Sequence, residues 1–240
     1  MGYPLLHTHF LGKKRFRLIN LPACQTGKIV DIMLIMQRHA KNFYVLYAEL
    51  VFFCNTTVKL NRMILSDLRI LEEIAKGTIV IEPYNRADLG SNSYDVHLGK
   101  WLATYTDEVL DAKKHNTITY FEIPEEGYVL HPSGFYLGVT EEYTETHAHV
   151  PFLEGKSSTG RLGIDIHATA GKGDVGFCGN WTLEISCKQP VRVYRGMPIG
   201  QLIYFPVDGE IGVKYNQKGN AKYSGQPNKP IESMMWKNKF

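Results

Sequence analysis

Short segments in which apolar and polar positions alternate dominate the chain after residue 77. Turn residues such as Pro83, Gly99 and Pro190 separate these segments, and each segment is predicted to be a strand. The predicted strands are Thr78–Glu82, Tyr94–Leu98, Tyr128–Leu130, Tyr136–Thr140, Leu183–Cys187, Val191–Tyr194 and Gly200–Phe205. Many short strands with few helices are typical of a mainly β fold, either a distorted β-barrel or a jelly-roll-like sandwich.

Two segments have the pattern of a helix. Ser66 can cap a short helix that Gly77 would end, because Ser is favoured at the N-cap and Gly after the last turn. The apolar face of this helix is predicted to consist of Leu68, Leu71 and Ile74. A second helical turn is predicted from Ser157 to Leu162. The expected architecture is therefore a strand-rich domain with a short N-terminal helix.

The first 62 residues differ in charge from the rest of the chain. They hold nine Lys or Arg against two acidic residues, whereas residues 63–240 hold 18 against 22. We interpret residues 1–62 as a basic N-terminal extension outside the fold, and residues 63–240 as the domain. Met63 is the expected start of translation, with a genuine basic arm or membrane-surface segment as the alternative. Because the domain is mildly acidic, a nucleic acid polymer is not an expected partner.

An apolar run from Tyr44 to Cys54 raises the question of a membrane segment. The run contains Glu49 and is too short to span a bilayer. It also lies too far from the N-terminus for a signal peptide. We therefore expect no membrane partner.

The spacing of cysteine and histidine does not favour a metal site. The cysteines, at positions 24, 54, 178 and 187, form no C-x-x-C pair, so reduced thiols in a cytoplasmic protein are the simplest interpretation. His147 and His149 could lie on one strand face, where two imidazoles can bind a metal. No Cys, Asp or Glu has a ligand-like spacing to them in the sequence. A polar turn after Glu145 is the favoured interpretation, and no metal ligand is predicted.

Residues 155–161 (GKSSTGR) place a cation and two adjacent Ser hydroxyls in a turn flanked by glycine. Such a turn can direct backbone N–H groups, hydroxyls and a Lys at phosphate oxygens. The G-x-x-x-x-G-K-[ST] order of a P-loop is missing. Taken alone, the segment fits a capped surface turn better than a phosphate site.

Two carboxylates follow this turn. Asp174 stands in a stretch with four glycines in twelve residues, 168–179, and such a stretch can lie close against a ligand or close a tight hairpin. By itself Asp174 fits an ordinary turn residue. Glu184 alternates with Leu183 and Ile185, so it lies on the opposite face of its strand. If that face is the barrel interior, the carboxylate must be paired or functional; a surface position is the alternative.

The run from Gly155 to Ile185, GKSSTGRLGIDIHATAGKGDVGFCGNWTLEI, resembles the central motifs of the dCTP deaminase family within the dUTPase superfamily. Three further segments resemble the start, the first motif and the closing motif of that family: Met63–Asp67, Ser93–Gly99 and Ala221–Gln226. The resemblance covers residues 63–230. It implies a distorted β-barrel of the dUTPase type that assembles as a homotrimer with active sites between subunits.

The resemblance also implies a role for each matching residue. Glu184 matches the general acid/base, which takes a proton from the attacking water and delivers protons to N3 and the leaving ammonia. Ser157 and Arg161 match residues that order this water and orient the base and Glu184. The backbone of Ala170 matches a contact to the base and the water. Asp174 matches an acidic residue near the sugar, which in bifunctional members supports water attack on the α-phosphate. The residues that match phosphate contacts are Lys156, Ser157, Ser158, Tyr215, Lys222 and Gln226.

The reaction that the resemblance implies is hydrolysis of dCTP to dUTP and ammonia, which feeds thymidylate synthesis. Mg²⁺ is expected only as the companion of the triphosphate, and the H/C-x-E and P-C-x-x-C motifs of zinc deaminases are missing. The alternatives are a bifunctional enzyme that releases dUMP and diphosphate, a dUTPase, and a nucleotide-binding protein without turnover.

The chain departs from the family pattern at two places. Residues 171–173 are Gly-Lys-Gly, where family members commonly carry bulkier residues in a loop that faces the base and the sugar. Lys156 stands where the family often has Arg, which preserves the charge but loses bidentate phosphate geometry. We expect the first departure to affect base selectivity.

Overall fold

The computed structural model describes residues 10–11, 14–15 and 64–240. The chain divides into two units, Met1–Leu60 and Asn61–Phe240. In the first unit, strand β1 (Phe10–Leu11) pairs with the antiparallel strand β2 (Lys14–Arg15).

Several predictions concern residues that lie outside the described ones. They are the assignment of residues 1–62 as an extension, the start at Met63, the interpretation of the run from Tyr44 to Cys54, and the reduced thiols of Cys24 and Cys54. These stay predictions. No helix in the described part of the chain is long and apolar enough to cross a bilayer.

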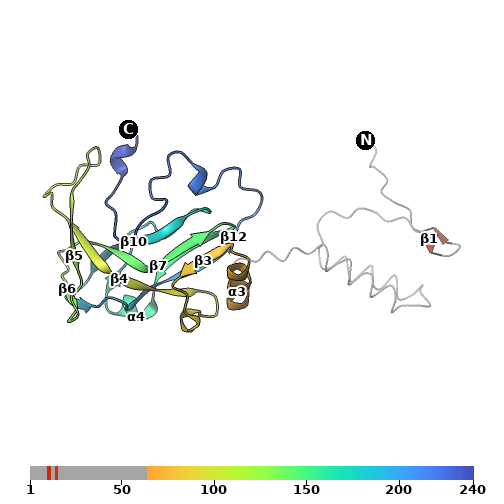
Figure 1. Cartoon of the computed structure of the whole chain (residues 1–240), viewed down its shortest axis with the longest axis horizontal. Helices are drawn as coiled ribbons and strands as arrows, with labels where there is room; N and C mark the ends of the chain where they lie inside the picture. Colours follow the sequence, from red (N-terminus) through yellow and green to blue (C-terminus); the bar gives the residue numbers. More distant parts are fainter. Residues whose placement is uncertain (1–9, 12–13, 16–63) are drawn as a thin grey trace. The chain divides into compact units, whose positions relative to one another are not determined.

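Strands are the main regular elements of the second unit (Figure 1). They are β3 (Ile79–Glu82), β4 (Tyr94–Tyr105), β5 (Ile118–Glu122), β6 (Tyr128–Leu130), β7 (Tyr136–Thr146), β8 (His149–Gly155), β9 (Ile164–Asp165), β10 (Cys178–Cys187), β11 (Val191–Val193) and β12 (Pro198–Pro206). The helical elements are α3 (Asp67–Ala75), α4 (Ser157–Arg161) and the 3₁₀ turns η1 (Arg86–Asp88), η2 (Tyr215–Gln217) and η3 (Met235–Lys237). The predicted mainly β fold is confirmed.

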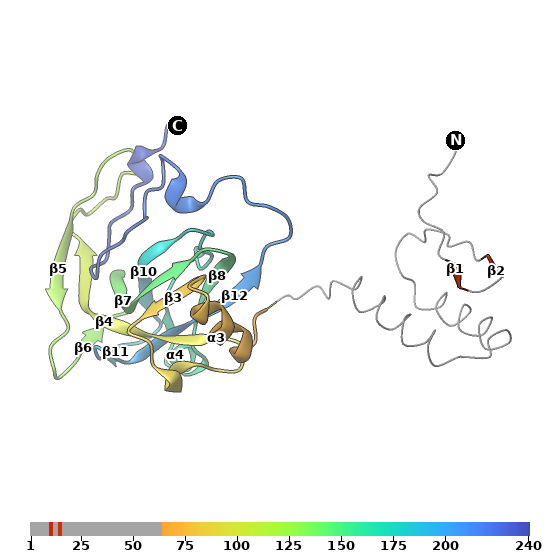
Figure 2. The same ribbon diagram turned by 45° about the vertical axis from the view of Figure 1, so that its right-hand side comes forward.

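One sheet of eight strands curves into a nearly closed barrel (Figures 1 and 2). Its order is β8-β12-β4-β7-β10-β9, while β3 pairs with β7 and β5 pairs with β4. The segment between β9 and β10 returns to β8, where the Leu153 N–H donates to the Gly171 carbonyl at 2.7 Å and the Gly173 N–H donates to the Pro151 carbonyl at 2.8 Å. These bonds join the two ends of the sheet.

Alternation along the strands separates the barrel interior from its outer face. On β10, Leu183 and Ile185 are fully buried, whereas the alternating Thr182 and Glu184 are only half-buried. Each large apolar side chain removed from water in this way stabilises the fold by roughly 1.5–3 kcal/mol. Other fully buried core residues are Tyr94, Val96, Leu98, Leu102, Ile199 and Leu202.

Helix α3 begins at the predicted cap, with the Oγ of Ser66 accepting a hydrogen bond from the backbone N–H of Arg69 at 3.4 Å. The predicted apolar face is wrong at one position. Leu68 is 67% exposed, and Ile70, which is 0% exposed, packs into the core instead. The buried face follows i, i+3 spacing from Ile70 to Glu73, so it is rotated away from Leu68.

The buried face of α3 therefore includes a carboxylate. Glu73 is 4% exposed, and it forms ion pairs with Arg69 at 2.9 Å and Lys76 at 3.0 Å. The Thr78 hydroxyl also donates to it. Burial alone would raise the pKa of Glu73, but the hydrogen bonds from Thr78 and Lys76 and the charge of Arg69 lower this pKa below its ordinary value.

All seven predicted strands are present, and most of them extend further than predicted. In the second unit, β5, β8 and β9 have no predicted counterpart. The sequence pattern does not predict strand β8, because two of its buried positions hold His149 and Pro151. Neither residue type indicates an apolar position in a strand. The predicted polar turn after Glu145 is confirmed between β7 and β8. The two imidazoles do not share a face, because His149 is buried while His147 is half-buried and pairs with Glu145.

Candidate active site

Strand β10 carries Glu184 on the outer face of the barrel. Because Leu183 and Ile185 on either side are fully buried, the hypothesis of a carboxylate in the barrel interior is wrong. The alternative of an outward-facing Glu184 is confirmed. The side chain is still half-buried, in contrast to a fully solvated surface carboxylate.

The segment that follows β9 lies along Glu184. The N–H of Glu184 donates to the carbonyl of Ile166 at 2.8 Å, and the N–H of Ala168 donates to Oε2 of the Glu184 carboxylate at 3.2 Å. Ala170 follows two residues later in an exposed position. Within residues 64–240, no protein hydrogen bond uses Oε1 of Glu184, so this oxygen can contact an incoming molecule.

The glycine-rich stretch packs its backbone against β8. A Cβ atom at Gly171 would lie 2.5 Å from the Leu153 carbonyl oxygen, and one at Gly173 would lie 2.6 Å from the Trp181 ring. These two glycines therefore allow close packing against strands of the same chain, and the predicted approach to a ligand stays a prediction. The Lys172 side chain points outward and its Nζ pairs with Oδ1 of Asp174 at 2.7 Å.

Helix α4 presents the polar residues of the predicted phosphate turn. Arg161 donates to the Oγ of Ser157 at 3.0 Å, and both side chains are exposed, as is Ser158. Lys156, which precedes the helix, forms a close ion pair with Asp95 on β4. The structure thus brings Ser157 and Arg161 into direct contact, while their predicted roles toward the water and the base stay predictions.

Two of the C-terminal candidates return to the region of β10. The N–H of Tyr215 donates to the carbonyl of Val175 at 2.8 Å, directly after Asp174 in the chain. Gln226 is buried, and its Oε1 accepts a hydrogen bond from the Thr182 hydroxyl at 2.7 Å. Thr182 lies two positions before Glu184 on the same face, roughly 7 Å away along the strand.

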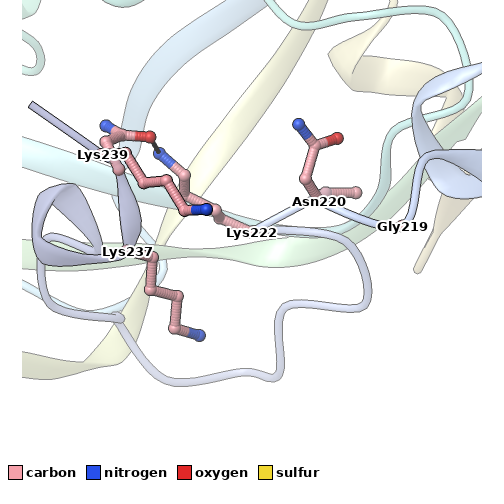
Figure 3. A pocket seen from close by; sticks show the side chains of 7 residues that line it. Gly219, Asn220, Lys222, Lys237 and Lys239 are labelled. Atoms are coloured by element: carbon pink, nitrogen blue, oxygen red, sulfur yellow. Dashed lines mark hydrogen bonds between the residues drawn. The ribbon is translucent and has the colours of Figure 1, made fainter.

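Lys222 lies in a basic pocket of about 360 Å³ near the C-terminus (Figure 3). Its Nζ donates to Oδ1 of Asn238 at 2.5 Å. The pocket is lined by Gly219, Asn220, Ala221, Lys222, Lys237, Asn238 and Lys239. Three ammonium groups in one pocket attract an anion.

All the candidate residues except Lys222 fall into two groups. The first lies at α4 and contains Lys156, Ser157, Ser158 and Arg161. The second surrounds the outer face of β10 and contains Ala170, Asp174, Glu184, Tyr215 and Gln226. No protein hydrogen bond or ion pair of residues 64–240 joins the two groups, and Figures 1 and 2 show α4 at the opposite end of the domain from η2 and the C-terminus.

Sequence reasoning missed residues that contact the candidates, among them Asp95 and Thr182. Asp95, within the Ser93–Gly99 segment, pairs with Lys156, and Thr182 holds Gln226. Alternation was the available signal in both cases. Asp95 is flanked by the buried Tyr94 and Val96 and therefore points outward, as Thr182 does on β10. Their partners lie far away in the sequence, so alternation could not identify them.

Comparison with known proteins agrees with the family resemblance of the sequence motifs. The profile of the family described as dCTP deaminase-like matches residues 64–207. A protein of Cytophaga hutchinsonii named "dCTP deaminase, dUMP-forming" is 49% identical over 176 residues, which are 73% of this chain and 98% of that protein. A protein of Clostridium acetobutylicum with the same name is 50% identical over the same shares of the two chains.

A solved structure shares the fold. The crystal structure of 2'-deoxycytidine 5'-triphosphate deaminase from Agrobacterium tumefaciens superposes with a TM-score of 0.51 and 21% identity. The match covers 63% of this chain and 50% of that chain, so this chain spans about half the length of that protein.

Proposed function

Because the chain belongs to the dCTP deaminase-like family, we propose that it converts dCTP to dUMP by two successive hydrolyses at one site. In the first, water replaces the amino group on C4 of cytosine, and dUTP and ammonia form. In the second, water attacks the α-phosphate, and dUMP and diphosphate are released. The product enters the synthesis of thymidylate.

One observation carries the deamination step. The Glu184 carboxylate is half-buried, with Oε2 held by the Ala168 N–H and Oε1 free for a ligand. The dUMP-forming step is supported by relatives named "dCTP deaminase, dUMP-forming", which are about half identical over nearly their whole length.

Glu184 serves as base and then as acid in the proposed deamination. It takes a proton from the water that attacks C4 and delivers it to N3, and it then takes the second proton from the new hydroxyl on C4 and delivers it to the amino group, which leaves as ammonia. A single carboxylate can do both because each uptake and delivery of a proton restores its ionised state. The backbone of Ala170, close to the segment that holds Glu184, contacts the base and the water.

Asp174 supports the second hydrolysis. The exposed carboxylate lies on the turn before β10, with Tyr215 anchored beside it at Val175. In the proposal it contacts the sugar and assists the water that attacks the α-phosphate. The close packing of Gly171 and Gly173 against β8 fixes the backbone of this turn.

The site combines two copies of the chain. Ser157 and Arg161 of one subunit order the water and orient the base opposite Glu184 of a neighbouring subunit, in a homotrimer. The separation of the two groups of candidate residues within one chain supports this arrangement. Lys156, Ser158, Tyr215, Lys222 and Gln226 contact the phosphates, several of them from the neighbouring subunit.

Mg²⁺ enters as part of the substrate. The triphosphate needs a counter-ion, and Mg²⁺ is commonly held by phosphates with few protein ligands. The pairing of Asp174 with Lys172 through Oδ1 leaves its other oxygen for a water of the hydrated ion.

Product analysis tests the proposal. The full chain is incubated with dCTP and Mg²⁺, and dUTP, dUMP, diphosphate and ammonia are separated and quantified. We expect ammonia together with dUMP and diphosphate. Ammonia with dUTP alone would reduce the function to a deaminase, hydrolysis of added dUTP without ammonia from dCTP would indicate a dUTPase, and tight binding without product would indicate a nucleotide-binding protein.

A further inference from the structure

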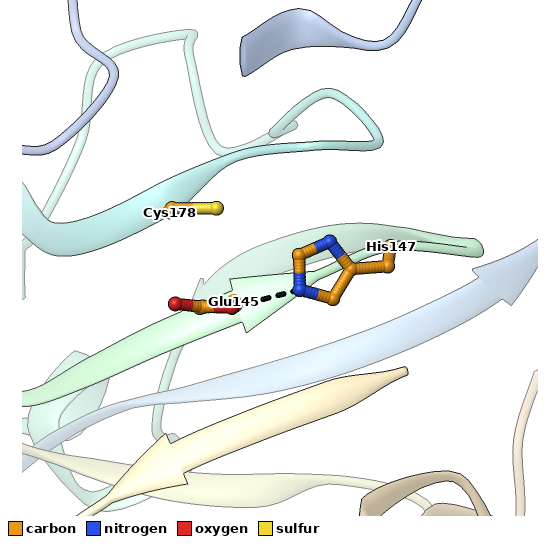
Figure 4. A group of neighbouring side chains, drawn as sticks. All are labelled: Glu145, His147 and Cys178. Carbon is orange, nitrogen blue, oxygen red and sulfur yellow. Dashed lines mark hydrogen bonds and ion pairs between the residues drawn. The ribbon is translucent and has the colours of Figure 1, made fainter. Parts of the chain in front are cut away.

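Three potential metal ligands meet where β10 begins (Figure 4). They are the carboxylate of Glu145, the imidazole of His147 and the thiol of Cys178, and one ligand atom from each lies within 4.8 Å of the others. All three side chains are partly accessible to solvent. Among the residues that the structure describes, no other three His, Cys, Asp or Glu residues come so close together.

Strand pairing explains this cluster. Cys178 lies directly opposite Glu145 in the antiparallel pair of β10 and β7, and side chains opposite each other point to the same face about 4.5–5.5 Å apart. His147 follows Glu145 by two positions and continues that face beyond the end of β7. The backbone of His147 is fixed by its N–H bond to the Thr78 carbonyl at 2.8 Å.

We propose that Glu145, His147 and Cys178 bind one Zn²⁺ ion, or a similar transition-metal ion, with water as the fourth ligand. Carboxylate, imidazole and thiolate are the side-chain ligands of zinc. The soft sulfur ligand disfavours Mg²⁺ and Ca²⁺, which take oxygen ligands. Binding replaces the thiol proton of Cys178, which is released to solvent.

Only small movements are needed to form the site. The Nε2 of His147 and Oε2 of Glu145 are 2.7 Å apart and share a hydrogen bond, whereas two such ligands on a tetrahedral zinc are roughly 3.3 Å apart. The Tyr143 hydroxyl donates to the other oxygen of Glu145 at 2.7 Å. Such an outer partner fixes the orientation of a ligating carboxylate.

The site lies away from the Glu184 carboxylate that carries the proposed deamination. Cys178 and Glu184 are six residues apart on β10, which is roughly 20 Å along an extended strand. An ion at this position links the end of β7 to the start of β10, just after the turn that carries Asp174. It therefore stabilises the folded barrel, because a metal that binds only the folded chain shifts the folding equilibrium.

Cobalt absorption tests the proposal. The full chain carries Cys24→Ser and Cys54→Ser, so that Cys178 and Cys187 are the remaining thiols, and it is titrated with Co²⁺ and then Zn²⁺. We expect one Co²⁺ per chain with a thiolate-to-cobalt charge-transfer band, which Zn²⁺ abolishes by displacement. In this background Cys178→Ser removes the band, and His147→Ala weakens Co²⁺ binding at least tenfold.

Matched variants distinguish Co²⁺ binding at this site from Co²⁺ binding by another thiol. Cys187→Ser, at the other end of β10, is expected to keep the band, and Tyr143→Phe is expected to weaken binding by about tenfold or more. Circular dichroism shows whether Cys178→Ser folds. If it does not, His147→Ala still tests the site, because His147 is partly accessible to solvent. The proposal is overturned if the background chain gives no band, if His147→Ala binds Co²⁺ normally, or if Cys187→Ser loses the band.

Discussion

At the scale of single residues, Glu184 combines partial burial with a half-satisfied carboxylate. The Ala168 N–H fixes one oxygen, while within the described chain the other has no hydrogen-bond partner. A fully exposed Glu would rotate freely, and a fully buried one would need partners for both oxygens. The observed position is therefore suited to proton exchange with a bound molecule.

Replacing Glu184 by Gln removes the proton acceptor and preserves the shape of the side chain. We expect Glu184→Gln to lower the rate of ammonia release from dCTP about 10²- to 10⁴-fold, the usual contribution of a general acid/base. Binding of dCTP, measured by calorimetry, changes little because the amide still accepts the Ala168 N–H. The exposed Glu125→Gln is the matched control and keeps full turnover; near-normal turnover of Glu184→Gln would refute the role.

Alternation predicted the orientation of Glu184 relative to Leu183 and Ile185, but it could not say which face pointed inward. The same limit applies to contacts between distant residues. Gln226 reaches Thr182, and Cys178 reaches Glu145, only because strand pairing and the path of the C-terminal segment bring them together. Single-sequence patterns contain no information about that register.

At the scale of elements, the turn between β9 and β10 depends on glycine at two positions. A Cβ at Gly173 would lie 2.6 Å from Trp181 and 2.8 Å from Pro151. We expect Gly173→Ala to lower the free energy of unfolding by roughly 1–3 kcal/mol, because the added methyl overpacks the site. Urea unfolding measures this loss. Gly212→Ala, whose Cβ meets nothing within 4 Å, should change stability by less than about 0.5 kcal/mol; equal losses would contradict the packing argument.

Helix α3 attaches to the barrel through the buried carboxylate of Glu73. Because the pKa of Glu73 is lower in the folded chain, its contribution is fully present above its ordinary pKa and is lost as the pH falls through the lowered one. We expect Glu73→Gln to destabilise the chain by roughly 1–3 kcal/mol at pH 7. The difference in the free energy of unfolding between this variant and the unsubstituted chain should shrink on acidification below about pH 4.5. Urea unfolding at several pH values measures it, and a difference that does not vary with pH would contradict the ion-pair account.

The sequence predicted element type better than element length. All seven predicted strands exist, because apolar alternation and turn residues are local signals. Strand β8 was missed because His149 and Pro151 occupy buried positions, and β5 was missed because most of its residues are exposed or half-exposed. The apolar face of α3 was misplaced because the charged Glu73 lies on the buried side, where its neighbours neutralise it.

At the scale of the whole molecule, the proposed homotrimer brings the candidate residues at α4 of one subunit to those at β10 of a neighbouring subunit. Arg161→Ala and Glu184→Gln are each expected to be inactive as homotrimers. When the two are unfolded together and refolded as a mixture, some sites combine an intact Arg161 with an intact Glu184. Random mixing should restore about one quarter of the original activity, because each site takes its two residues from neighbouring subunits of a cyclic trimer.

Ammonia release from the refolded mixture measures this recovery, with each variant refolded alone as the control. Activity no higher than in those controls would place both residues of a site in the same subunit. It would not alter the assignment of either residue to the reaction.

The central claim is that one site performs both hydrolyses before the product leaves. It is tested most directly by following labelled dCTP in the presence of excess unlabelled dUTP. We predict that the label passes into dUMP from the start of the reaction, with one ammonia per labelled dUMP and almost no label in the dUTP pool. Label that accumulates in free dUTP, and reaches dUMP only after that pool is consumed, would contradict the claim.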